Sequence, residues 1–251
     1  AGGKAVGYKD DNGIEASFEN PTAIAIDEDN NIYVSDTLNN VIRKIDIDAN
    51  VVTYAGKKGD NSILYEPAGL AFDRDGNLFV ADSANHQIKK ITGDGKVETI
   101  AGFHFIKDRE SDYWLGGYRN GFLEKSYFNF PKDIIVKDDG TIFVADAYNH
   151  VIRRIKDSEV VTMAGAGVAG DAINSKYVSY FDGPIGIAHV KNTLFVVDQW
   201  NNRILLIPDN LRFLKAIDKG DDKEEDLLVF VDNKEVSFLD AYPNFVDEKV
   251  K

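Results

Sequence analysis

Four aspartates, each followed three residues later by an asparagine, are the side chains whose type and spacing first suggest chemistry in this sequence. Carboxylates that converge on one point could hold a metal ion or transfer protons. The alternative is local, because Asp and Asn side chains in turns hydrogen-bond to nearby backbone. Their recurrence in one sequence context favours the local role, so we predict a structural function for all eight residues. The pairs are Asp36 and Asn39, Asp82 and Asn85, Asp146 and Asn149, and Asp198 and Asn201.

The histidines and the acidic turns give weak evidence for a metal site. His86 and His150 directly follow two of these asparagines and share their structural interpretation, whereas His189 falls in a predicted strand. The turns at 27–31 and 73–77 resemble fragments of a calcium loop. A complete loop needs six or more oxygen ligands and a late bidentate Glu, which is missing here. We therefore expect no cofactor, with calcium at these turns as the alternative.

The sequence lacks the common catalytic motifs. It contains no cysteine, which excludes disulfides, thiolate zinc sites and cysteine nucleophiles. It also has no Gly-x-Ser-x-Gly, His-Glu-x-x-His or Gly-Lys-Ser/Thr motif. Asp133 and Lys137 lie on or beside a predicted innermost strand, where they could line an axial channel or form a surface pair. No catalytic residue is predicted.

The Asp-x-x-Asn pairs belong to a unit that is written four times along the chain. The copies begin FENPTAIAID, YEPAGLAFD, FNFPKDIIV and FDGPIGIAHV. Each continues with a polar turn, an apolar and aromatic segment, the Asp-x-x-Asn turn and a third segment such as VIRKI. The first three copies then end in a fourth segment that closes with Ala-Gly. Alternation, β-branched residues and turn residues predict a β-strand for every segment.

Four antiparallel strands per unit, repeated along the chain, are typical of β-propeller blades. One such sheet cannot bury both of its faces, whereas sheets packed face to face around an axis can. In the second strand of the first copy, Ile32 and Val34 should face one neighbouring blade, and Tyr33 and Ser35 the other. The sequence therefore predicts an all-β fold, a β-propeller of four-stranded antiparallel blades over residues 1–210.

The prolines, the YV-x-D or FV-x-D strand, the Asp-x-x-Asn turn and the closing Ala-Gly resemble NHL-type β-propeller repeats. The resemblance implies a ring that is often six-bladed, with one blade shared by the two termini. Some members are lyases with metal-binding histidines near the channel, a set that this sequence does not reproduce. The fourth copy departs from the pattern: it reads HVKNT after its first strand and has Leu205 and Leu206 in place of a basic pair. We expect its lateral contacts to differ.

Residues 103–127 lengthen one connection between repeats. Long loops that carry aromatic residues are candidate binding elements, although the rings can also pack onto the propeller face. Its GYRNG sequence resembles the segment from Gly7 to Gly13, so part of the insertion is an ordinary connection between blades. The candidate binding residues are His104, Tyr113, Trp114, Tyr118 and Arg119.

After the repeats, residues 211–226 form a charge-dense linker, and residues 227–251 predict two strands around an Asp-Asn-Lys turn. This last segment resembles the opening hairpin of the copper amine oxidase-like N-terminal domain of bacterial extracellular proteins. The resemblance implies a further domain, or the segment adds strands to the propeller. No copper ligand is carried over.

Net charge and hydropathy limit the classes of partner that the chain is expected to bind. The chain of 251 residues has a formal net charge of -13, which disfavours nucleic acid and anionic lipid. No apolar run is long enough for a membrane span. Our leading hypothesis is a non-enzymatic binding or scaffold propeller of a secreted or cell-surface bacterial protein, with a protein, peptide or glycan as partner. The alternatives are a metal-assisted lyase or hydrolase in the axial funnel and a structural subunit that self-assembles through strand exchange.

Overall fold

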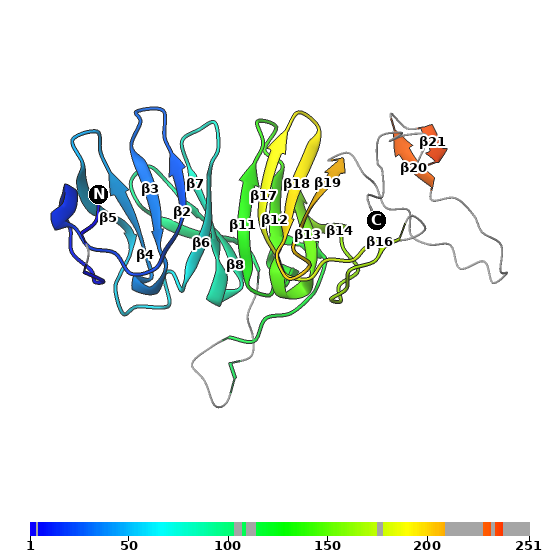
Figure 1. Cartoon of the computed structure of the whole chain (residues 1–251), viewed down its shortest axis with the longest axis horizontal. Helices are drawn as coiled ribbons and strands as arrows, with labels where there is room; N and C mark the ends of the chain where they lie inside the picture. Colours follow the sequence, from blue (N-terminus) through cyan, green and yellow to red (C-terminus); the bar gives the residue numbers. More distant parts are fainter. Residues whose placement is uncertain are drawn as a thin grey trace.

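The computed structural model describes residues 1–3, 5–102, 107–108, 114–174, 178–208, 228–231 and 234–237. Regular structure in these residues consists of β-strands and short 3-10 turns. Four antiparallel sheets stand side by side in chain order, and each sheet is one copy of the repeat (Figure 1). The fold is the all-β propeller architecture that the repeat predicts.

The strands of each blade follow one another in sequence, and their order in the sheet is also sequential. Blade 1 contains β2 (Pro21–Ile26), β3 (Ile32–Asp36), β4 (Val41–Ile45) and β5 (Asn50–Gly56). Blade 2 contains β6 (Pro67–Phe72), β7 (Leu78–Asp82), β8 (Gln87–Ile91) and β9 (Val97–Ala101). Blade 3 contains β11 (Pro131–Val136), β12 (Ile142–Asp146), β13 (Val151–Lys156) and β14 (Glu159–Ala164). Blade 4 has three described strands, β17 (Pro184–Val190), β18 (Thr193–Asp198) and β19 (Arg203–Pro208).

Short elements complete the description. The strands β1 (Asp11–Asn12) and β10 (Gly121–Phe122) extend blades 1 and 3 by pairing with β5 and β14. Two separate hairpins are formed by β15 (Ile173–Asn174) with β16 (Val178–Ser179), and by β20 (Leu228–Val231) with β21 (Lys234–Ser237). The 3-10 turns are η1 (Gly13–Glu15), η2 (Thr37–Asn39), η3 (Ser83–Asn85), η4 (Leu123–Lys125) and η5 (Ala147–Asn149).

Three apolar clusters lie between successive blades and hold them together. Because strand residues alternate between faces, each blade sends one set of side chains to the preceding blade and the other to the next. Tyr33, Ile42 and Ala55 of blade 1 pack on Leu70 and its neighbours in blade 2. The same arrangement recurs between blades 2 and 3 and between blades 3 and 4. The first strands contact one another from blade to blade, which places them at the inner edge.

The aspartate of each repeat is buried at the end of the second strand and holds the chain segment that enters the blade. In blade 1, Asp36 is fully buried and its Oδ1 accepts a hydrogen bond from the Glu19 N–H at 2.7 Å. Asn39 donates from Nδ2 to this carboxylate and to the Gly7 carbonyl, both at 2.9 Å. One Asp-x-x-Asn turn therefore hydrogen-bonds to two parts of the chain segment that precedes the blade.

The same bonds recur in the other three blades. The backbone N–H groups that donate to the repeat aspartates are those of Tyr65, Asn129 and Asp182, at 2.7, 2.7 and 2.6 Å. The carbonyls that accept from the repeat asparagines are those of Asn61, Gly117 and Gly170, at 3.0, 2.8 and 2.7 Å. All four copies thus use the pair in one structural role.

A buried basic residue completes this turn, and the sequence analysis did not identify it. In blades 1 and 3, Arg43 and Arg153 are fully buried and donate from Nη1 to the repeat aspartate at 2.8 Å. In blade 2 the equivalent residue is Lys89, whose Nζ lies 3.8 Å from Asp82. Burial raises the pKa of Asp82 to about 6, against the opposing charge of Lys89.

In blade 4 the repeat aspartate also pairs with an arginine, but this arginine comes from a different position in the third strand. Leu205 occupies the place of Arg43, and Arg203 donates from Nε to Asp198 at 2.8 Å. Residues two apart in a strand lie on the same face, so a shift by two positions preserves the contact. The predicted difference of the fourth copy is therefore visible in this blade, whereas the ion pair itself is retained.

Replacing Arg153 with Met should lower the free energy of unfolding by about 3–5 kcal/mol, because Asp146 would remain as a buried charge without its cation. Burial already raises the pKa of Asp146, and Arg153 opposes that shift. Urea unfolding followed by circular dichroism measures the loss.

The matched control is Arg74→Met. Arg74 pairs with Asp138 on the surface, with side chains 68% and 75% exposed, so its removal should change the urea midpoint little. Equal effects of the two substitutions would contradict the structural role of the buried pair.

Candidate binding site

The second residue after each repeat aspartate lies at the apex of a tight turn on one face of the propeller. In the first three blades the turn closes with a residue in the left-handed region, which bends the chain sharply into the third strand. The apex residues Leu38, Tyr148 and Trp200 are 50%, 48% and 52% exposed, whereas Ala84 is buried. This turn face therefore presents large apolar side chains to solvent.

Rings from blades 2 to 4 meet along the turn face and form what we name the aromatic strip. His86 packs edge-on against Phe130, with ring centroids 4.6 Å apart, and Phe130 lies 4.8 Å from Tyr148. Trp200 lies 6.0 Å from Tyr148 and 6.3 Å from His150. Such rings combine a large apolar surface with polar edges, a combination suited to binding.

Glycine at position 183 lets Trp200 lie against the backbone. A Cβ at this residue would stand 3.0 Å from the indole ring, and its φ of +64° also favours glycine. The equivalent position in blade 3 is Phe130, itself a member of the strip. In blades 3 and 4 the residue before the repeat proline therefore determines how the rings pack on the turn face.

His86 joins the strip to the insertion. Its Nδ1 accepts a hydrogen bond from the Phe130 N–H at 2.9 Å, so the neutral ring carries its proton on Nε2. Nε2 then donates to the Trp114 carbonyl at 2.7 Å. His86 is nearly fully buried and acts as a fixed connector, in agreement with the structural role expected of it.

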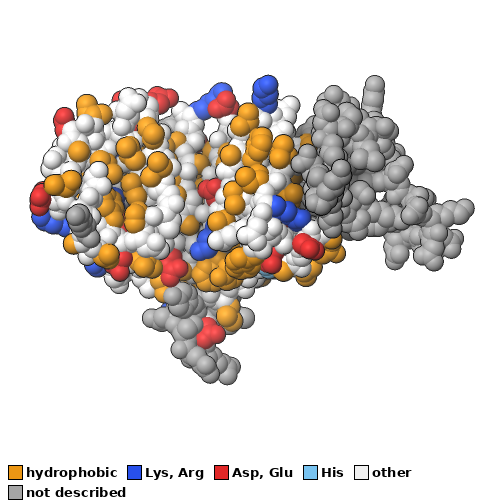
Figure 2. All heavy atoms as spheres, viewed as in Figure 1, with side chains coloured by type: hydrophobic (Ala, Val, Ile, Leu, Met, Phe, Trp, Pro, Cys, Tyr) orange, Lys and Arg blue, Asp and Glu red, His pale blue; other side chains and the backbone are white. Residues whose placement is uncertain are grey.

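The insertion begins and returns beside this histidine. Lys107 and Trp114 form an isolated antiparallel bridge, and the Lys107 ammonium lies 5.1 Å from the Trp114 ring. The described parts of the insertion extend from the lower side of the molecule in Figure 1. In the same orientation, apolar side chains gather along the lower edge (Figure 2). His104 and Tyr113 lie outside the described residues.

Tyr118 and Arg119 belong to the regular connection between blades. The Tyr118 hydroxyl bonds to Thr162 at 2.6 Å and its ring lies 5.3 Å from the Arg153 guanidinium. Tyr8 makes the equivalent contacts in blade 1, with Thr53 and Arg43. Of the predicted binding residues, Trp114 therefore adjoins the strip, and Tyr118 and Arg119 pack beside the buried arginine of blade 3.

Asp133 lies at the inner edge, where blades 2, 3 and 4 meet. Its carboxylate accepts from the Ile134 N–H at 2.9 Å and from the Ile187 N–H of β17 at 2.8 Å. A Cβ on Gly69 of β6 would approach Asp133 Oδ1 to 2.6 Å, so only glycine fits there. Burial raises the pKa of Asp133 to about 6, because two N–H groups only partly replace water. Lys137 closes the adjacent hairpin through its backbone.

The acidic turns that resemble calcium loops bond to themselves. Asp27 accepts from the N–H groups of Asp29 and Asn31 at 3.0 and 2.8 Å. Asp73 accepts from Asp75 and Asn77 in the same way. Among the described residues, no group of three or more His, Asp or Glu side chains is arranged to hold a metal ion.

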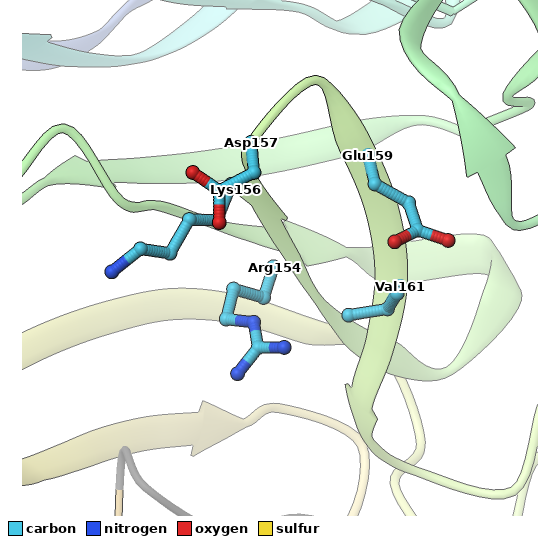
Figure 3. Close-up of a pocket in the computed structure, with 5 residues that line it drawn as sticks. All are labelled: Arg154, Lys156, Asp157, Glu159 and Val161. Atoms are coloured by element: carbon cyan, nitrogen blue, oxygen red, sulfur yellow. The ribbon is translucent and has the colours of Figure 1, made fainter.

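A cavity of about 250 Å³ opens elsewhere, on the β13–β14 hairpin (Figure 3). It is lined by Arg154, Lys156, Asp157, Glu159 and Val161. None of the predicted binding residues and no ring of the strip belongs to it. The candidate site is therefore the turn face.

Phe130, Tyr148 and Trp200 were missed in the sequence because the apex and pre-proline positions differ from copy to copy. A usable signal was present: two neighbouring copies place aromatic residues at the apex, in DAYN and DQWN. The arginines were missed because adjacent basic residues in a strand point to opposite faces, and the pattern alone does not say which of the two is buried.

Blades packed face to face, each ending its second strand in an Asp-x-x-Asn turn, define a β-propeller. The family model for the Teneurin NHL domain matches residues 56–156, from the end of β5 through β13. This match supports the NHL-type repeat over that part of the chain. No helix in the described part of the chain has the length and apolar character needed to cross a bilayer.

Among curated proteins, the chain is similar to Protein SUPPRESSOR OF QUENCHING 1, chloroplastic, of Arabidopsis thaliana. The two are 32% identical over 111 residues, which are 43% of this chain and 10% of that protein. The chain therefore spans a tenth of this relative.

Solved structures show the same fold at low sequence identity. An auxiliary nutrient binding protein of Bacteroides thetaiotaomicron has a TM-score of 0.58 and 14% identity, covering 76% of this chain and 48% of that one. A gluconolactonase of Xanthomonas campestris has a TM-score of 0.55 and 16% identity, covering 86% and 60%. A streptogramin B lyase has a TM-score of 0.51 and 15% identity, covering 75% and 51%. The chain thus spans about half to three fifths of these proteins.

Asp133 should make the stability of the fold depend on pH between about 4 and 6. Its pKa is about 6 in the folded protein against an ordinary 3.8, so its stabilising contribution is complete below pH 4 and is lost as the pH rises through 6. The difference in unfolding free energy between wild type and Asp133→Asn should change across this window and level off above it. Urea unfolding at a series of pH values measures it.

The control is Asp139→Asn. A hydrogen bond from Lys156 lowers the pKa of Asp139, so that carboxyl stays ionised throughout the window. Its difference from wild type should stay nearly constant from about pH 5 to 7 and shrink slightly toward pH 4, where the unfolded carboxyl begins to take up a proton. If the difference in unfolding free energy between wild type and Asp133→Asn were also independent of pH, the raised pKa of Asp133 would be contradicted.

Proposed function

We propose that the chain is a non-enzymatic binding or scaffold propeller that recognises a protein, peptide or glycan on its turn face. The observation that carries this proposal is the pair of half-exposed rings of Tyr148 and Trp200, which lie 6.0 Å apart on that face. Trp114 of the insertion reaches the same face through His86. The recognition surface comprises the aromatic strip and the insertion, including the candidate residues His104, Tyr113, Trp114, Tyr118 and Arg119.

Two physical points support a binding role. Trp and Tyr residues supply most of the energy in many interfaces, because they bury a large area with few rotatable bonds. The carboxylates that first suggested chemistry are already engaged with backbone N–H groups, asparagine amides and buried cations. The repeat carboxylates are therefore not free to act on a partner, whereas the rings of Tyr148 and Trp200 are half exposed.

We also place the protein outside the cell, at a bacterial surface or in the secreted fraction. The similarity to an auxiliary nutrient binding protein of Bacteroides supports this location. The β20–β21 hairpin is consistent with the start of a copper amine oxidase-like N-terminal domain. In this arrangement residues 1–210 form the propeller and residues 211–226 link it to the next unit.

Intrinsic fluorescence offers a direct test, because the chain has two tryptophans, Trp114 and Trp200, and both lie at the proposed site. Peptide and glycan arrays would supply ligands, and each ligand should change the tryptophan emission on titration. Tyr148→Ala should weaken binding by about 30-fold or more, the effect expected of a central aromatic contact.

Phe122→Ala is the matched control, since Phe122 is 60% exposed but lies on β10 rather than on the turn face. The Phe122→Ala variant should bind each ligand with the same affinity as wild type. Ligands that bind Tyr148→Ala and wild type equally would refute the turn face as the site.

A metal-assisted lyase or hydrolase is the second candidate, favoured by the buried Asp133 with its raised pKa and by the similarity to a lyase and a gluconolactonase. Elemental analysis that found a stoichiometric divalent ion, together with turnover lost in Asp133→Asn, would favour it over the binding proposal.

A further inference from the structure

The outer strand of blade 2 differs from the outer strands of blades 1 and 3 in one respect. In blades 1 and 3 the fourth strand pairs on its outer side with a short fifth strand, β1 or β10, which comes from the connection before the blade. The sheet of blade 2 ends at β9, so β9 has a strand neighbour on one side only among the described residues. Blade 2 lies between two described blades, and the connection that leads into it is described throughout. We call this outer side of β9 the open edge.

The open edge follows from a short connection. In blade 1, the Gly7 carbonyl accepts from the repeat asparagine and the Glu19 N–H donates to the repeat aspartate, twelve residues further on. In blade 2 the equivalent residues, Asn61 and Tyr65, are only four apart. Blade 2 therefore lacks the eight residues in which the fifth strand lies elsewhere. The separation is again twelve residues in blade 3, from Gly117 to Asn129, and in blade 4, from Gly170 to Asp182.

The residues that receive a fifth strand are nevertheless present in β9. Its sequence VETIA matches the VVTYA of β5 and the VVTMA of β14, so that all three strands carry Val-x-Thr. Val51 and Val160 pair with the fifth strand and are 2% and 0% exposed. Val97 is only half-buried and Thr99 is exposed. An open strand edge offers unpaired N–H and C=O groups to another chain.

The segment that forms the fifth strand also reads the threonine and the buried cation through two side chains. In blade 1 the Tyr8 hydroxyl bonds to Thr53 Oγ1 at 2.7 Å. The Asp10 carboxylate accepts from the Thr53 N–H at 2.9 Å and from Arg43 Nη2 at 2.5 Å. In blade 3 the equivalent contacts measure 2.6, 3.2 and 2.9 Å and are made by Tyr118 with Thr162, and by Asn120 with Thr162 and Arg153.

Blade 2 keeps a buried cation at this place. Lys89 is paired with Thr99 in the sheet, as Arg43 is with Thr53. Its ammonium donates to Thr99 Oγ1 at 2.7 Å and lies 3.8 Å from Asp82. An ammonium has three donors, and a carboxylate is the acceptor that binds it most strongly. A carboxylate placed beside Thr99, as Asp10 is placed beside Thr53, would therefore be attracted to Lys89.

We propose that a partner protein binds the open edge of β9 and adds an extended segment as the fifth strand of blade 2. The segment carries a tyrosine and, two residues later, an aspartate or asparagine, as the chain's own fifth-strand segments do. Its backbone pairs with Val97, and its two side chains contact Thr99 and Lys89. Main-chain bonds supply affinity in such strand addition, and side chains supply specificity.

The occupant comes from another protein because β1 and β10 are already paired with β5 and β14. The open edge lies on the outer strand of blade 2 and shares no residue with the turn face. This inference is therefore independent of the proposed function.

The chain itself supplies the probe, a synthetic peptide with the sequence AVGYKDDNGIE of residues 5–15. At saturation it should slow amide hydrogen exchange of Val97 and Thr99 by about 10-fold or more, because both N–H groups gain an acceptor. The peptide with Asp10→Lys should bind about 10-fold more weakly, because its ammonium would face Lys89. Unchanged exchange at Val97 and Thr99 at millimolar peptide, or equal binding of the two peptides, would overturn the proposal.

Two further observations come from the same nuclear magnetic resonance spectra. Without peptide, the amides of Val97 and Thr99 should exchange faster than those of Val51 and Thr53. Slow exchange at Val97 and Thr99 in the free chain would mean that the chain covers its own edge, which would also overturn the proposal. The indole signal of Trp200 should not move on titration; a shift there in place of one at Val97 would put the peptide on the turn face instead.

Filling the edge from within the chain gives an independent test. Insertion of YKDDNGIE, the sequence of residues 8–15, between Asn61 and Ser62 restores the separation of twelve residues found in the other blades. The inserted segment acts at a high effective concentration, so the added peptide should bind at least about 100-fold more weakly. Undiminished peptide binding by a folded insertion variant would contradict the proposed site.

Val97→Pro removes one N–H from the open edge, a place where a strand tolerates proline, and should weaken peptide binding by about 10-fold or more. The matched control is Arg74→Met, which also lies in blade 2 but in the β6–β7 turn, and it should bind the peptide like wild type. Circular dichroism of both variants separates lost binding from lost folding. Equal affinity of a folded Val97→Pro variant and wild type would count against strand addition at β9.

Discussion

The buried aspartate at the end of the second strand is the interaction on which the rest of the structure depends. Its carboxylate gathers a backbone N–H, an asparagine amide and a basic side chain, and each partner belongs to a different segment. A buried charge is costly without partners, so the surrounding chain must supply all of them together. The turn is thereby fixed, and with it the position of the apex residue on the surface.

The need to pair the buried aspartate explains why the residues whose types suggest metal binding or proton transfer are not available for either role. In the first three blades the aspartate, the asparagine and the basic residue of the repeat are buried, and the two turn histidines accept hydrogen bonds that join one blade to the next. The side chain at the apex, two residues after the aspartate, is not among these partners, whereas Thr37 beside it is buried and donates to the Pro67 carbonyl at 2.8 Å. A change of the apex side chain therefore leaves the hydrogen bonds of the turn beneath it in place.

Blade 4 shows how far the repeat can change while its turn is maintained. The cation moves from the position of Leu205 to Arg203, yet it still reaches Asp198. On the opposite face Leu206 stands where the other blades have a lysine or arginine, and the apex holds Trp200 over Gly183. Changes in this blade therefore alter side chains at the apex and at Leu206 and leave the ion pair intact.

The sequence by itself determined the repeat, the strands and the all-β propeller, because strand alternation and turn residues are local properties that four copies reinforce. It also placed the Asp-x-x-Asn pairs in turns. Only the tertiary structure decided that Phe130, Tyr148 and Trp200 meet, since their contacts join residues from separate blades. Burial of Arg43 and Arg153 was likewise hidden, because besides the nearby aspartate they donate to the carbonyls of Ser17 and Tyr127, 26 residues earlier in the chain.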